Sequence, residues 1–170
     1  LAYGLRVPGT KGLMSKGIPS YVFKHTREFF PNDIKDLTRK LRANQLRGGT
    51  AAIFIEPVGP ESGTRPLSKE FIKATERLAK KYGALLVFDE VVTGFRIGPS
   101  GAQGFFGVDP DLTIFGKIVA GGYPGAGGIG GHADVMAYLG AGLDSSGKKV
   151  PKALCGGTLA ATPISCVAGY

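Results

Sequence analysis

The chain has 170 residues, of which 43% are hydrophobic and 20% are charged. This is enough for one domain with its own core, and it excludes a disordered polymer. No apolar run reaches the roughly 18 residues of a membrane span, and the net charge of +8 is spread along the chain with no aromatic-interleaved basic stripe. These features argue against a transmembrane segment and against nucleic acid binding.

Cysteine and histidine are both scarce. Cys155 and Cys166 lack the spacing of a disulfide framework or a redox motif, so we expect a reducing, cytoplasmic setting. His25 and His132 lie far apart in the sequence and lack metal-ligand spacing. The sequence therefore predicts no metal site.

The first third of the chain contains one clear helix signal. Residues 1–31 mix Gly, Pro and basic residues, which predicts a loop-rich N-terminal segment with one short strand at 20–24. Asn32 and Asp33 then offer caps to a helix that ends before Gly48, with apolar side chains spaced i, i+3, i+7. We therefore expect residues 32–170 to form the structured domain.

Three short apolar runs predict strands buried on both faces, at 51–55, 84–88 and 112–115. A helix between the first two is capped by Ser68 and ends at Gly83. This alternation predicts an α/β fold with a mostly parallel sheet and flanking helices.

An ionisable residue follows each predicted strand: Glu56, Asp89 and Lys117. In open α/β sheets, ligands bind outside the carboxyl ends of the strands, so the three together indicate a site. We expect poorly solvated surroundings for Lys117, which would make its amine a nucleophile toward a carbonyl; a lysine reaching out to water is the alternative. Asp89 could keep a pyridine nitrogen protonated, or it could be a helix cap or a loop ion pair.

The glycine-rich stretch 121–131 contains a GxGxxG match at Gly125, Gly127 and Gly130. A dinucleotide fingerprint follows a strand directly and opens a helix. Here Pro124 intervenes, and we expect a turn into a short strand with no helix following at once. A nicotinamide-dependent dehydrogenase remains an alternative on this match alone.

A second glycine-rich turn ends in Gly157 and Thr158 and precedes Thr162-Pro163, which predict the N-cap and first residue of a helix. Glycines and a hydroxyl near a helix start suit phosphate binding, although the same residues are common in plain turns.

Two stretches together resemble the class III pyridoxal-phosphate aminotransferases: 86–96, which contains Asp89, and 109–117, which ends in Lys117. The resemblance covers roughly residues 30–170, and residues 101–103 with the loop around them are similar to the glutamate-1-semialdehyde aminomutase branch. It implies the central part of the large domain of a fold-type I pyridoxal-phosphate transferase. The N-terminal part and the C-terminal small domain would lie outside this chain, which we expect to be inactive alone.

The resemblance assigns roles to residues of this chain. Lys117 would form the Schiff base with the cofactor and shuttle the proton, and Asp89 would keep the pyridinium charged. Val91 would pack on one face of the ring, and Val92 occupies a position near the phenolic oxygen. These roles identify pyridoxal 5'-phosphate as the expected cofactor.

Three further residues would complete the site. Thr158, preceded by Gly157, would reach the cofactor phosphate of the neighbouring subunit, which implies a homodimer with shared active sites. Glu61 falls where several aminotransferases keep a gating glutamate, whereas aminomutases tend toward Asn.

The resemblance implies transfer of an amino group between an amino acid or amine and a keto acid or aldehyde, both small molecules. The intramolecular aminomutase reaction and a non-catalytic ligand-binding chain of the same fold are the alternatives.

Overall fold

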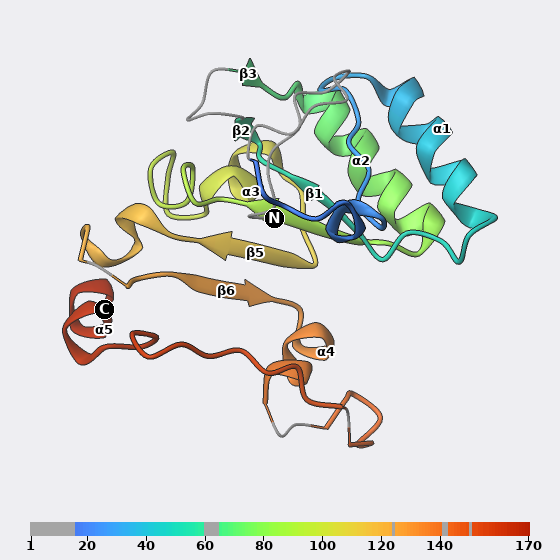
Figure 1. Cartoon of the computed structure of the whole chain (residues 1–170). Coiled ribbons are helices and arrows are strands. Elements are labelled where there is room, and N and C mark those ends of the chain that lie inside the picture. Colours follow the sequence, from blue (N-terminus) through green and yellow to red (C-terminus); the bar gives the residue numbers. More distant parts are fainter. Residues whose placement is uncertain (1–15, 60–64, 124, 141–142, 150) are drawn as a thin grey trace. The chain divides into compact units, whose positions relative to one another are not determined.

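The structure is a computed structural model that describes residues 16–59, 65–123, 125–140, 143–149 and 151–170 (Figure 1). The chain divides into two compact units, Leu1–Thr50 and Ala51–Tyr170.

The first unit begins with a single helical turn where a strand was predicted. Residues Ser20–Phe23 form the 3-10 helix η1, in which the Val22 amide donates to the Pro19 carbonyl at 3.1 Å. The expectation of a strand at 20–24 is therefore wrong, because these backbone amides bond locally rather than across a sheet.

Helix α1, Ile34–Gln45, starts where the sequence predicts it. The Asp33 carboxylate caps it by accepting a hydrogen bond from the Asp36 amide at 2.9 Å. Leu37 and Leu41 are each 2% exposed, whereas Ile34 at the helix start is 40% exposed. The predicted apolar face is thus confirmed over its last two positions.

The Asp36 carboxylate on α1 is buried and well compensated. It accepts hydrogen bonds from Lys40 at 2.7 Å, from Arg39 at 2.5 Å and from the Phe30 amide at 3.0 Å. Burial alone would raise the pKa of Asp36, but the hydrogen bonds from these donors outweigh it and lower the pKa to about 2.

The second unit is built on a four-stranded sheet with the order β1-β4-β5-β6 (Figure 1). The first three strands run parallel and β6 runs antiparallel to β5. Their bounds are Ala52–Ile55, Leu85–Asp89, Leu112–Phe115 and Gly128–Gly131. A small antiparallel pair stands apart from this sheet, formed by β2 Val58–Gly59 and β3 Arg65–Pro66. The mostly parallel α/β sheet is therefore confirmed.

Burial differs between the central and outer strands. In β4, Leu86, Val87 and Phe88 are at most 1% exposed, so burial on both faces is confirmed there. In β1, Phe54 is 40% exposed. The expectation of a doubly buried strand is wrong for β1, because it lies at an edge of the sheet that the described residues form.

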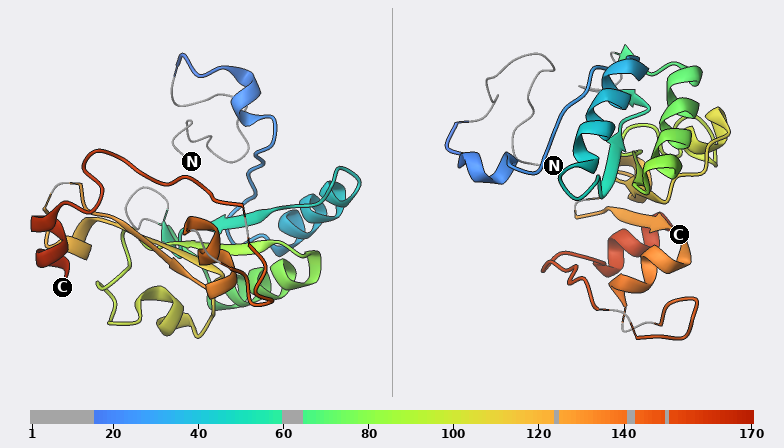
Figure 2. Two further views of the ribbon diagram at one scale, coloured as in Figure 1. Left: turned by 90° about the horizontal axis from the view of Figure 1, so that it is seen from below. Right: turned by 90° about the vertical axis from the view of Figure 1, so that its right-hand side faces the viewer.

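Helix α2, Lys69–Tyr82, packs along one face of the sheet, where it contacts β1 and β4 (Figure 2). The Ser68 hydroxyl caps its start by accepting from the Phe71 amide at 3.1 Å. Gly83 ends it with a φ of 66°, a left-handed conformation that glycine adopts without a steric penalty. Phe71 and Ile72 are at most 1% exposed, and burial of each contributes about 1.5–3 kcal/mol.

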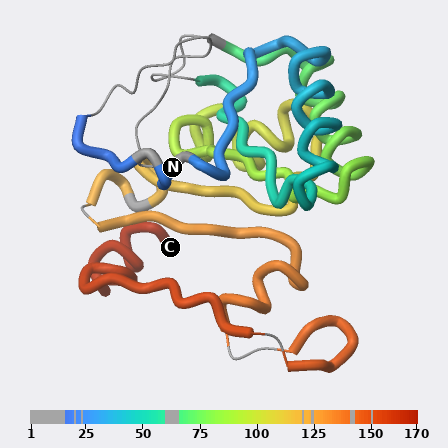
Figure 3. The backbone as a smooth tube through the Cα atoms, turned by 45° about the vertical axis from the view of Figure 1, so that its right-hand side comes forward, coloured from blue at the N-terminus to red at the C-terminus, as the bar shows by residue number. Residues whose placement is uncertain are grey.

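The remaining elements are short. They are α3 Gly101–Phe106, the 3-10 helix η2 Lys117–Ala120, α4 Ala133–Met136, the 3-10 helix η3 Ala137–Leu139 and α5 Pro163–Gly169. Helix α5 contacts η2, so segments far apart in sequence lie side by side (Figure 3). Within the described residues, no helix is long and apolar enough to cross a bilayer.

Two sequence expectations about these short elements are wrong. Residues 101–103 belong to α3 rather than to a loop, since six residues are too few to show helical periodicity. The glycine-rich stretch does enter a strand, β6, as predicted, but α4 follows β6 after the single residue His132. The GxGxxG match itself opens no helix, which argues against a dinucleotide fingerprint.

Candidate functional site

The topology brings Glu56, Asp89 and Lys117 to the same edge of the sheet. Glu56 directly follows Ile55, which pairs with Phe88, the residue before Asp89. Asp89 in turn pairs with Ile114, three residues before Lys117. Because β1, β4 and β5 are adjacent and parallel, these three residues lie at or just beyond the carboxyl ends of neighbouring strands.

The electrostatics of Glu56 show that the three groups interact. Burial raises the pKa of Glu56, the Asp89 charge raises it further, and the Lys117 charge lowers it. Glu56 also packs closely on Gly59, where an added Cβ would lie 2.2 Å from the Glu56 Oε2. The charges of both Asp89 and Lys117 thus act on the Glu56 carboxylate.

Val91 connects the acid with the segment that carries the lysine. Its amide donates to the Asp89 Oδ1 at 3.1 Å, which orients that carboxylate. Its side chain lies against Gly116, where an added Cβ would approach the Val91 Cγ1 to 3.2 Å. A side chain at position 116 would therefore crowd Val91 and require it to shift by a few tenths of an ångström.

Lys117 has an unusual backbone conformation and an exposed side chain. Its φ is 49°, in the left-handed region that costs a non-glycine residue on the order of 1 kcal/mol. Such strained residues cluster at functional sites. The expectation of poorly solvated surroundings is wrong for this chain, because Lys117 opens η2 beyond the end of β5, next to Ile118, which is 41% exposed.

The predicted phosphate residues, Gly157 and Thr158, are exposed. The loop that carries them lies against the glycine-rich stretch, since an added Cβ at Gly125 would come within 3.2 Å of the Leu159 carbonyl oxygen. This loop leads into α5, which starts at Pro163 as predicted and contacts η2. The loop therefore lies between the glycine-rich stretch, which Leu159 contacts, and α5, which contacts the segment that begins at Lys117.

For two further predicted site residues, Val92 and Glu61, the structure gives little or no information on their roles. Val92 is half-buried beside Val91. Glu61 lies outside the residues that the structure describes, so its gating role stays a prediction.

Glu90 is a residue whose importance the sequence analysis missed. It directly follows Asp89, and its carboxylate is fully buried. Its hydrogen-bond donors lie as far along the chain as Ala102 and Gln103, 12 and 13 residues away. An acid next to a strand end carries no local pattern that would reveal such partners.

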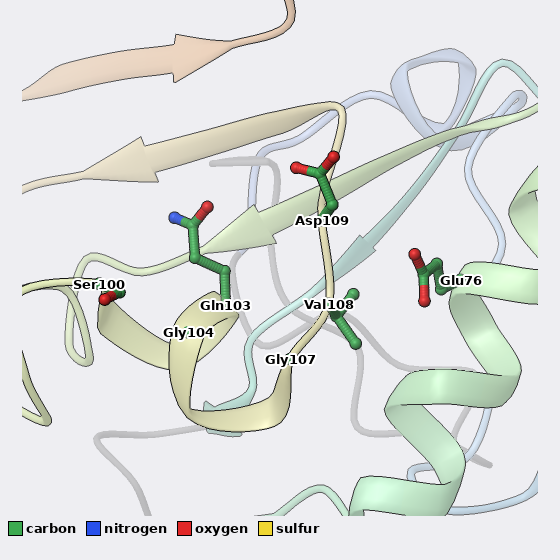
Figure 4. Close-up of a pocket in the computed structure, with 7 residues that line it drawn as sticks. All are labelled: Glu76, Ser100, Gln103, Gly104, Gly107, Val108 and Asp109. Carbon is green, nitrogen blue, oxygen red and sulfur yellow. The ribbon is translucent and has the colours of Figure 1, made fainter.

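A surface hollow of about 580 Å³ is lined by none of the three strand-end residues (Figure 4). It is lined by Glu76, Ser100, Gln103, Gly104, Gly107, Val108 and Asp109. These residues come from α2, α3 and the segments that flank α3, and none of them is a predicted site residue. Within the described part of the chain, no cluster of three or more His, Cys, Asp and Glu side chains could hold a metal ion.

Comparison with known proteins identifies the family. The class III aminotransferase family model matches residues 14–170, so the chain belongs to this family. It is 48% identical over 122 residues to a glutamate-1-semialdehyde 2,1-aminomutase of Pyrobaculum islandicum, which covers 72% of this chain and 28% of that protein.

Solved structures agree with this assignment. An omega-transaminase from Sphaerobacter thermophilus superposes with a TM-score of 0.78 at 35% identity, covering 92% of this chain and 34% of that one. A transaminase solved with PLP bound superposes with a TM-score of 0.76 at 31% identity, covering 91% of this chain and 34% of that one. The chain thus spans about a third of the length of the relatives it matches, and its fold is that of these transaminases.

Proposed function

We propose that this chain forms part of a pyridoxal-phosphate-dependent enzyme that moves an amino group between an amino acid or amine and a keto acid or aldehyde. The observation that supports the proposal is that Asp89 ends β4 and Lys117 follows the end of the neighbouring parallel strand β5, with the charges of both acting on Glu56. An acid and an amine at the ligand-binding edge of an α/β sheet fit this chemistry.

The residues present fit pyridoxal phosphate by their chemistry. Lys117 would hold the cofactor through its Nζ and would carry a proton to and from the substrate carbon. Asp89, oriented by the Val91 amide, would keep the pyridine nitrogen charged. When bound, the cofactor supplies an electron sink for the carbon that loses its proton.

The other assigned residues would complete binding. The Val91 side chain would pack against the ring, with Val92 beside it near the phenolic oxygen. Gly157 and Thr158 would bind the phosphate across a homodimer interface, and Glu61 would act as a substrate gate. The substrates would be small molecules, and the free, exposed Cys155 and Cys166 fit a reducing cytoplasmic setting.

A glutamate-1-semialdehyde aminomutase is the second candidate. It is favoured by the 48% identity to a relative of that name. In that reaction the amino group moves within one molecule, so no separate carbonyl acceptor is needed. Assays of the complete gene product with and without an added keto acid distinguish the two: dependence on the acceptor supports transfer between molecules.

A titration with pyridoxal phosphate tests the proposal as a whole. The complete gene product should develop the long-wavelength absorbance of a protonated Schiff base, and Lys117→Ala should lose it. Lys148→Ala is the matched control, because Lys148 is an exposed loop lysine. If Lys117→Ala keeps the absorbance, the proposal fails. Cofactor binding through Lys117 without turnover of any amino donor would instead favour a non-catalytic member of the fold.

A further inference from the structure

The Glu90 carboxylate is fully buried and accepts four hydrogen bonds, all from uncharged donors. The donors are the Thr93 hydroxyl at 3.1 Å, the Ala102 amide at 2.6 Å, the Gln103 amide at 3.1 Å and the Gln103 side-chain amide at 3.4 Å. A carboxylate that is removed from water destabilises a fold unless its oxygens are satisfied in this way. Glu90 therefore ties the segment after β4 to the start of α3.

The Gly101 backbone lies directly against the Glu90 carboxylate. An added Cβ would lie 2.2 Å from the Glu90 Oε2, and the φ of Gly101 is 57°. Both the close approach and the left-handed backbone favour glycine at this position. The pair of Glu90 and Gly101 thus forms a specific contact rather than a general polar one.

The Glu90 main chain fixes the turn that carries Val91. Its amide donates to the Ile114 carbonyl on β5 at 2.9 Å, and its carbonyl accepts from the Gly94 amide at 2.8 Å. Between these two bonds lies Val91, whose amide orients Asp89 and whose side chain rests against Gly116.

From these contacts we infer that Glu90 is a positioning residue for the candidate site. Its side chain holds both ends of the segment from Thr93 to Gln103, and its main chain anchors the turn at Val91. It acts through Val91 on the direction of the Asp89 carboxylate. The part of this inference that concerns the cofactor rests on the proposed function.

The test uses Glu90→Gln in the complete gene product, because Gln keeps the shape but replaces one acceptor oxygen with an NH₂ group that faces donors. Glu70→Gln, an exposed acid in the first turn of α2, is the matched control. In the cofactor-free protein, amide hydrogen exchange at Val91 should be at least about tenfold faster in Glu90→Gln and unchanged in the control.

The second readout is cofactor binding. Glu90→Gln should bind pyridoxal phosphate roughly 10–100-fold more weakly, by analogy with the loss of a supporting hydrogen-bond partner at a metal site. The pH at the midpoint of the bound cofactor's absorbance change should also shift, which a general loss of stability would not produce. Wild-type exchange at Val91 together with a wild-type midpoint would overturn the inference.

Thr93→Val provides a second test of the role of Glu90 if Glu90→Gln does not fold. It removes one donor to Glu90 at nearly constant volume and should move both readouts in the same direction by a smaller amount. A folded Thr93→Val variant with neither change would also overturn the inference. If the wild-type protein binds no cofactor, the proposed function fails, while the exchange experiment still decides whether Glu90 orients Val91.

Discussion

Two carboxylates show how differently this chain treats acids that are removed from water. On α1, Asp36 is buried among Lys40, Arg39 and a backbone amide, and its pKa falls to about 2. At the sheet edge, Glu56 is partly buried beside a second acid, Asp89, and its pKa is raised.

The difference separates a stabilising arrangement from a functional one. Local cations and amides compensate Asp36, so its charge favours folding. Burial and Asp89 disfavour the charge of Glu56, and Lys117 offsets this only in part. A fold keeps such unfavourable charges together mainly where a ligand or a reaction uses them.

The largest expected effect comes from removing the acid that would face the cofactor. Asp89→Asn should lower the rate of amino transfer by roughly 100-fold or more, the scale of losing one electrostatic contact to a transition state. Steady-state kinetics of the complete gene product measures this. Asp109→Asn, an acid whose side chain is 76% exposed, should keep the wild-type rate. Equal rates for wild type and Asp89→Asn would contradict the assignment of Asp89.

The next effect concerns stability on α1. Because the pKa of Asp36 is lowered to about 2, its contribution is fully present above its usual value of 3.8 and is lost as the pH falls toward 2. Asp36→Asn should therefore lower the free energy of unfolding by up to about 2 kcal/mol at neutral pH. Urea unfolding at neutral pH and near pH 2 measures this. A loss of equal size at both pH values would show that charge is not the cause.

The smallest effect is an increase in stability. Because the pKa of Glu56 is raised, its charge destabilises the fold once the pH passes through the raised value, and the protonated form carries no such cost. Glu56→Gln should therefore raise the melting temperature slightly at neutral pH, and the gain should vanish at acidic pH. Thermal unfolding across this range checks the sign. A lower melting temperature at neutral pH would mean that Lys117 outweighs burial and Asp89.

Much of the fold could be predicted from the sequence, because the residues that start and end its helices and strands form local patterns. Ser68 and Gly83 bound α2, and the apolar run at 84–88 predicts the buried strand β4. Since parallel strands end at one edge, the residues that follow them could be expected to meet there.

The other features of the fold and of the candidate site depend on contacts between distant residues, which no local sequence pattern encodes. Burial of β1 depends on its place at the edge of the described sheet, which leaves Phe54 exposed. Lys117 is exposed where it opens η2 beyond the end of β5. The buried role of Glu90 requires Gly101 and the start of α3, a helix too short to recognise from periodicity.

Peptide mapping after borohydride reduction of the cofactor-loaded protein identifies the amine that holds the cofactor. Reduction fixes the cofactor to the amine that holds it, and mass spectrometry then locates the modified residue. We expect a single phosphopyridoxyl group on the peptide that contains Lys117, absent in Lys117→Ala and retained in Lys148→Ala. A modified peptide elsewhere, with Lys117 unmodified, would contradict this expectation.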